Sequence, residues 1–108
     1  MFNPLSLLMS LLKGGRIDEF SRELAAEFAR RYPLELGAAS DKKREKKLGR
    51  ALNHVYKRAG EFARERSLGV YGTARLGNGF KWALREMGYR KEFIDEATKG
   101  LVLNARGK

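Results

Sequence analysis

The chain has 108 residues, of which 43% are hydrophobic and 33% are charged, and its formal net charge is +10 at pH 7. This length and this apolar content predict one folded domain over residues 1–108, with one modest core. Cysteine is absent and His54 is the single histidine. Disulfides, cysteine-based zinc sites, thiolate catalysis and multi-histidine metal sites are therefore excluded.

An apolar run of eleven residues, Phe2 to Leu12, lies near the start of the chain. A membrane span takes about 20 apolar residues, and the run lacks the basic start and the small-residue cleavage site of a secretory signal. We therefore expect a cytoplasmic protein with no transmembrane segment. The run predicts a helix from Pro4 to Lys13 that stops at the glycine pair 14–15.

Apolar residues point nearly all round this first helix, so it has to be covered. Three surroundings could bury its apolar surface: the core of the bundle, a second copy or another protein, and a membrane. Lys13 is the sole cation of the helix, which makes it a poor match for an anionic membrane surface. We favour the core or a partner, and the contacts to a partner would be made by Leu5, Leu8, Met9 and Leu12.

Two segments with helical spacing of apolar residues follow. The first covers about residues 17–32 and ends before Pro33, because the residue that precedes a proline avoids helical geometry. A loop over 33–40 leads to the second, residues 41–66, which Ser40 or Asp41 can cap. This longest helix would span about 39 Å at 1.5 Å per residue. The side chains that we expect to face the core are Ile17, Phe20, Leu24, Phe28, Leu48, Leu52, Val55, Ala59 and Phe62.

The last third of the chain predicts two shorter helices, about 73–87 and 90–104, after a connector over 67–72. Gly88 ends the first, and Tyr89 is placed to pack on Ile94 at the start of the second. The best strand candidate, residues 101–103, is short, and residues 105–108 should fray. The side chains of the two shorter helices that we expect to face the core are Leu76, Phe80, Ala83, Leu84, Met87, Phe93, Ile94, Ala97 and Leu101. The predicted fold is therefore all-α, a small bundle of four to five helices.

Most of the excess charge lies on the long central helix, since residues 40–66 carry ten Lys and Arg against four Asp and Glu. On a helical wheel these cations fall opposite the apolar stripe and form one basic ridge, interrupted mainly by Glu61. Cations along such a ridge can bind backbone phosphates by displacing condensed counterions. The alternative is a merely solvated helix face. The basic ridge consists of Lys43, Lys46, Arg50, Asn53, Lys57 and Arg64.

A second candidate is an aromatic residue among cations on the 73–87 segment. Trp82 falls away from the predicted core face, on a stripe with Arg75, Asn78 and Arg85, and Tyr89 continues the line. A flat aromatic face suits an unpaired base, and the neighbouring charges suit its backbone. The alternative is that the N-terminal helix or the 67–72 connector covers Trp82, since tryptophan is usually largely buried.

Other chemistries have less support. The spacing from Gly72 to Gly77 fits a phosphate loop, but Asn78 and Gly79 stand where lysine and serine or threonine are required, so close helix packing explains these glycines better. A helix-turn-helix around Gly88 would bring three carboxylates, Glu92, Asp95 and Glu96, to the phosphates of a DNA groove. No carboxylate pair indicates acid–base catalysis, and we expect His54 to be exposed. We expect neither an enzyme nor a cofactor.

The sequence therefore predicts a small basic helical protein that binds nucleic acid, with RNA or single strands preferred over duplex DNA. The alternative, from a different class, is a protein-interaction or self-associating module that uses the apolar N-terminal helix. In that case the charge serves solubility or an acidic partner. Salt separates the two hypotheses, because phosphate binding weakens steeply with salt and an apolar contact does not.

Overall fold

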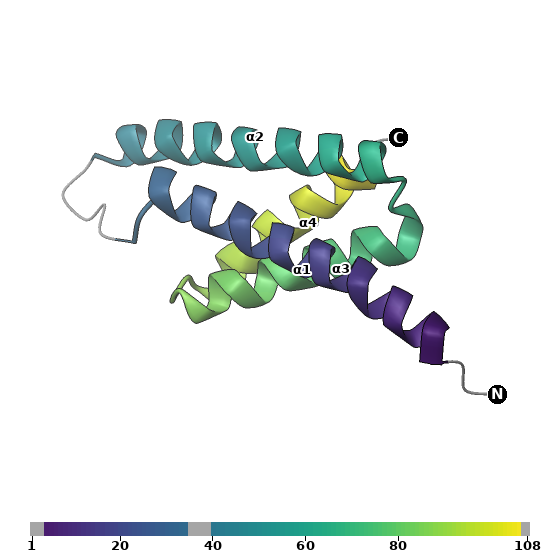
Figure 1. The fold of residues 1–108 in the computed structure, drawn as a ribbon. Helices are drawn as coiled ribbons and strands as arrows, with labels where there is room; N and C mark the ends of the chain where they lie inside the picture. The colour runs from purple at the N-terminus through teal and green to yellow at the C-terminus, as the bar shows by residue number, and fades with distance from the viewer. Residues whose placement is uncertain (1–3, 35–39, 107–108) are drawn as a thin grey trace.

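The structure is a computed structural model that describes the backbone of residues 4–34 and 40–106 and the side chains of residues 15–34 and 40–106. These residues form four helices and no strand, which confirms the all-α bundle (Figure 1). The helices are α1 (Pro4–Arg31), α2 (Asp41–Arg66), α3 (Gly69–Glu86) and α4 (Lys91–Arg106).

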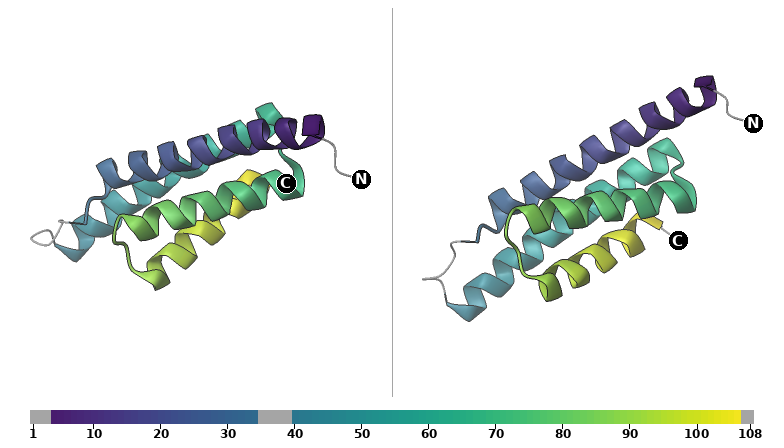
Figure 2. Two further views of the ribbon diagram at one scale, coloured as in Figure 1. Left: turned by 60° about the horizontal axis from the view of Figure 1, so that its bottom comes forward. Right: turned by 90° about the horizontal axis from the view of Figure 1, so that it is seen from below.

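The helices pack as a ring (Figures 1 and 2). Helix α1 lies along α2 and α3, and α4 lies along the same two helices, whereas α2 and α3 are diagonal and barely touch. Phe20 of α1 stacks on Phe62 of α2 with ring centroids 3.9 Å apart, and Asp18 of α1 binds Arg75 of α3. The outer faces of α2 and α3 therefore point away from each other.

The predicted apolar stripes form the core. Leu24, Leu76 and Leu84 are fully buried, and each such burial contributes about 1.5–3 kcal/mol relative to exposure. At the end of the bundle beside residues 33–34, four rings cluster with neighbouring centroids 5.6–6.2 Å apart; they belong to Phe28, Tyr32, Tyr89 and Phe93. The remaining predicted core residues are either buried or packed against the buried ones, so the predicted core is confirmed.

Two glycines of α3 allow neighbouring helices to approach closely. A Cβ atom on Gly77 would lie 2.6 Å from Val102 Cγ2 of α4, and one on Gly79 would lie 2.5 Å from Ser21 Oγ of α1. Both separations are shorter than van der Waals contact, so a larger residue fits only if its neighbours move. Close packing is therefore sufficient to explain these glycines.

The course of α1 differs from the prediction. The helix passes through residues 14–15 without a break, so the expected stop is wrong and the helices predicted over 4–13 and 17–32 are one helix. A glycine inside a helix costs about 1 kcal/mol but does not by itself end the helix. Termination requires a change of backbone conformation, such as the positive φ of 99° at Gly88 after α3. The predicted end before Pro33 is confirmed, because α1 stops at Arg31.

Helix α2 has the predicted bounds, and the Ser40 hydroxyl caps it by accepting a hydrogen bond of 3.2 Å from the Lys43 amide. Helix α3 begins at Gly69, earlier than the predicted residue 73, so the connector is only residues 67–68. The chain reverses there through two left-handed residues, Ser67 with φ 49° and Gly69 with φ 70°. This tight reversal leaves the residues after Gly69 free to be helical.

Helix α4 is longer than predicted and contains no strand-like break. Residues 101–103 lie within it, and Leu101 is fully buried. The expected fraying from residue 105 is wrong for Ala105, which is helical and buried against the core. Tyr89 and Ile94 are both buried at the start of the helix, as the predicted staple requires. Residues 35–39 of the predicted loop and residues 107–108 lie outside the described residues.

Candidate nucleic-acid interface

The basic ridge lies along the outer face of α2, at the top of the molecule in Figure 1. Val55 and Ala59 on the opposite face are fully buried in the core, which turns the ridge toward solvent. All six ridge residues are exposed. Between Lys43 and Arg64 the ridge rises about 32 Å at 1.5 Å per residue.

No carboxylate in the described part of the chain neutralises the ridge cations. None of the five forms an ion pair with another residue that the structure describes. Glu61, the predicted interruption, is half-buried and forms no ion pair within the described part of the chain. A row of cations with no carboxylate partner keeps its charge available and attracts anions to this side of the molecule.

Trp82 on α3 is 51% exposed, so neither the N-terminal helix nor the connector covers it. The guanidinium carbon of Arg85 lies 5.2 Å from the centroid of its ring, in a cation–π contact. Asn78 and Arg85 are themselves exposed. Three members of the predicted stripe therefore lie together at the surface, with the aromatic ring accessible for stacking.

A groove of about 600 Å³ runs between α1 and α3 beside Trp82. Asp18 and Arg22 line it from α1, and Asn78, Trp82 and Glu86 are among the residues that line it from α3. Its two arginines are balanced by its two carboxylates, so the groove has no net formal charge.

Tyr71 lines the same groove and is 70% exposed. It stands eleven residues before Trp82 on one helix, which places the two rings about 16 Å apart along the axis. Tyr71 was not among the predicted site residues, because it falls within the predicted connector. The signal that could have found it is the helical spacing from Tyr71 through Arg75 and Asn78 to Trp82.

Arg75 is held in an interhelical ion pair. Its Nε and Nη2 donate to the two carboxylate oxygens of Asp18, at 3.0 and 2.9 Å, and its Nη1 donates to the Tyr71 hydroxyl at 3.0 Å. The hydrogen bonds that Arg75 donates to Asp18 and, to a smaller extent, to Tyr71 raise the pKa of Arg75 above its usual value. The charge of Arg75 is balanced within the fold, so we leave it out of the phosphate-binding set.

Tyr89 does not continue the Trp82 stripe. It is only 8% exposed and belongs to the aromatic cluster with Phe28 and Phe93. Its hydroxyl donates a hydrogen bond of 2.6 Å to the Tyr32 carbonyl. The helical line breaks before it, because α3 ends at Glu86 and the turn redirects the chain.

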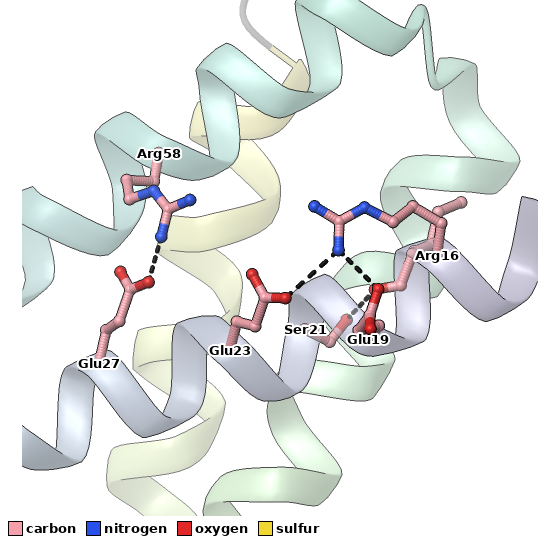
Figure 3. Close-up of polar contacts among 7 residues, drawn as sticks. Arg16, Glu19, Ser21, Glu23, Glu27 and Arg58 are labelled. Carbon is pink, nitrogen blue, oxygen red and sulfur yellow. Dashed lines mark hydrogen bonds and ion pairs between the residues drawn. The ribbon is translucent and has the colours of Figure 1, made fainter.

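His54 is not the exposed side chain that we expected. It is half-buried between α2 and α1, and its Nε2 lies 2.8 Å from Glu27 Oε1. The other oxygen of Glu27 accepts a hydrogen bond from Arg58, as Figure 3 shows. Burial raises the pKa of Glu27, but the hydrogen bonds from Arg58 and His54 outweigh it and bring the pKa below 4.5. This cluster is an interhelical ion-pair network.

The ridge and the Trp82 groove do not form one surface. The ridge faces outward from α2, whereas the groove is lined by α1 and α3, and α2 and α3 are diagonal in the ring. Figure 1 places α2 along the top of the molecule and α3 along the bottom. The structure therefore brings the predicted site residues together as two separate sets.

Among the residues described, no group of three or more His, Asp or Glu side chains is close enough to hold a metal ion. Within the same residues, none of the helices combines the length and the apolar content that crossing a bilayer requires. Comparisons with protein-family models, with curated proteins and with solved structures give no significant match for this chain.

Proposed function

We propose that the protein binds single-stranded nucleic acid, RNA in particular, through the basic ridge of α2. The observation that carries this proposal is the alignment of five exposed cations, unpaired among the described residues, along about 32 Å of one helix face. The preference for unpaired bases is supported by a separate feature, the exposed Trp82 ring on α3, because bases inside a duplex are not free to stack on a side chain.

The expected strength of this binding depends on salt. Each cation that replaces a condensed counterion on a single strand steepens the log–log dependence of affinity on salt by about 0.7. If all five ridge cations contact phosphates, the slope should be about −3.5. Because phosphates carry no sequence information, affinities for different single strands of equal length should be similar.

The test is a neutral triple variant on the ridge, Lys46→Gln, Arg50→Gln and Lys57→Gln. Its affinity for a single-stranded RNA, measured by fluorescence anisotropy over a series of salt concentrations, should fall for all sequences alike. The slope should flatten by about 2, because three phosphate contacts are lost.

A matched control removes the same charge from scattered positions on α1 and α4, as Arg30→Gln, Lys99→Gln and Arg106→Gln; all three residues are exposed. This control should keep the slope of the parent protein. Equal slopes in the two triple variants would show that net charge, and not the ridge, governs binding. Absence of binding at low salt would end the proposal.

A second candidate function is association through the first turns of α1. These turns extend past the ends of α2 and α3 (Figures 1 and 2). The apolar residues proposed as contacts, Leu5, Leu8, Met9 and Leu12, belong to this part of the helix, and their side chains lie outside the described residues. A helix that projects from its bundle and is apolar in sequence favours a partner over the bundle core.

A further inference from the structure

Two surfaces of different chemistry lie on diagonal helices. The basic ridge presents cations without an aromatic ring, whereas the groove between α1 and α3 presents Trp82 and Tyr71 without net formal charge. A phosphate gains little from a groove whose charges are balanced, but a base gains by stacking on an exposed ring. The ridge therefore suits the backbone of a strand, and the groove suits an unpaired base.

The groove has features that fit a base. Trp82 supplies an exposed ring, and Arg85 lies 5.2 Å from the ring centroid, where it can also meet a phosphate that flanks the base. Asn78 and Glu86 are exposed on the same side of α3, one helical turn before and after Trp82, and both line the groove. An amide and a carboxylate beside a stacked base can hydrogen-bond its edge.

One short strand cannot serve both surfaces. The Cα atoms of the bundle span 28 and 20 Å in its two shorter directions, and the surfaces point away from each other across it. A strand laid on the ridge would have to pass round α1 before a base reached Trp82. The described part of α1 has three exposed arginines, Arg22, Arg30 and Arg31, but they are spread around the helix and form no row. Its charged side chains that face α2 are bound in the Arg16 and Glu27 ion pairs (Figure 3).

We infer that the protein bridges two nucleic-acid segments. The ridge binds the backbone of one strand, and the groove takes an unpaired base of a second strand on Trp82. This inference rests on the proposed function and adds to it a second contact with its own chemistry. A rigid body that carries both contacts holds the second strand at high effective concentration near the first.

The experiment uses two non-complementary RNA strands of about eight nucleotides, one with a donor dye and one with an acceptor dye. Full-length protein at low salt should bring the dyes together and produce energy transfer. The transfer should fall again when protein is in excess, because each strand then occupies its own protein molecule. Trp82 is the only tryptophan, so its fluorescence should change as the groove fills.

Trp82→Ala should weaken capture of the second strand about 5- to 150-fold, the range for loss of one base–aromatic stack. Its binding of a single labelled strand should stay within about threefold of the parent, because the ridge is intact. Trp82→Phe keeps a ring and should retain bridging. The matched control is Leu103→Ala, which removes a comparably exposed apolar side chain (57%) from α4 and should change nothing.

The outcomes separate this inference from the proposed function. Binding without energy transfer would show one strand per protein, which overturns bridging and leaves ridge binding intact. Undiminished transfer in Trp82→Ala would show that the second contact is elsewhere, for example on a second copy of the chain, and the inference would be wrong. If neither strand binds at low salt, both proposals fail.

Discussion

Two glycines inside helices have different surroundings, and replacing each with alanine should change the free energy of unfolding in different ways. Gly49 of α2 is exposed, and a Cβ atom there would meet nothing within 4 Å. Gly79 of α3 faces α1, and its Cβ atom would lie 2.5 Å from Ser21 Oγ and 2.7 Å from Ser21 Cβ. Ser21 cannot swing away freely, because it is buried and its hydroxyl lies 3.0 Å from both the Ile17 and the Leu76 carbonyl oxygens.

The magnitudes follow from these surroundings. Alanine in a helix interior is favoured over glycine by about 1 kcal/mol, so Gly49→Ala should stabilise the protein by about that amount. For a domain of this size that corresponds to a rise in Tm of about 4–8 °C. Gly79→Ala gains the same helix propensity, but the added methyl group overpacks the contact of α1 with α3, which costs about 1–3 kcal/mol. The two substitutions should therefore differ by about 1–3 kcal/mol.

The assay is thermal and urea unfolding of both variants, followed by circular dichroism. A double variant, Gly79→Ala with Ser21→Gly, removes the atoms that obstruct the new methyl group. Its stability should exceed the sum of the two single effects, which is the coupling expected for residues in contact. If Gly79→Ala stabilises the protein as much as Gly49→Ala does, α1 and α3 are not packed as closely as described and the reasoning is refuted.

Two further predictions concern α1. Because the pKa of Glu27 is lowered in the folded protein, its contribution to stability is fully present above pH 4.5 and is lost as the pH falls through the folded value. Tm should therefore fall more steeply on acidification in the parent than in Glu27→Gln, and parallel curves would show that the network with Arg58 and His54 does not stabilise the fold. Removal of residues 1–13 should change either the oligomeric state or Tm. An unchanged elution volume together with an unchanged Tm would exclude association through this segment.

Most of the fold could be predicted from local patterns. The bounds of α2 were predicted because Ser40 is a strong N-cap and the apolar stripe runs unbroken through Leu52, Val55 and Phe62. The continuity of α1 could not be predicted, because a glycine pair stops a helix only if the chain takes another course there. Glycine lowers helix stability by about 1 kcal/mol but does not force a turn, so the local sequence leaves that course open.

The candidate site could be predicted only in part. The exposure of the ridge follows from one helix, because its cations lie opposite an apolar stripe that must be buried. Helical periodicity also placed Trp82 outside the core, but the partners of Arg75 and His54 come from α1, and no spacing within α2 or α3 reveals them. The separation of the two surfaces arises because α2 and α3 lie diagonally opposite each other in the bundle. That arrangement depends on how all four helices pack, and the pattern within one helix does not reveal it.

A count of charged residues in the sequence does not distinguish the cations bound in ion pairs within the fold from the cations that face solvent on the ridge. The four acidic residues of α1 all pair with arginines, and the arginines used are Arg16, Arg58 and Arg75. The planar guanidinium suits such fixed pairs, whereas lysine is a flexible point charge that suits phosphates reached from solvent. Three of the five ridge cations are lysines.

This division makes the salt dependence the decisive measurement. If the whole net charge of +10 acted on a bound strand, the slope would approach about −7. The five ridge cations alone give about −3.5. A measured slope near the smaller value means about five phosphate contacts, and its flattening in the ridge triple variant but not in the control assigns those contacts to the ridge. A slope near the larger value would mean that a single strand wraps the bundle, and neither the ridge nor a separate second contact in the groove would then describe how this protein holds nucleic acid.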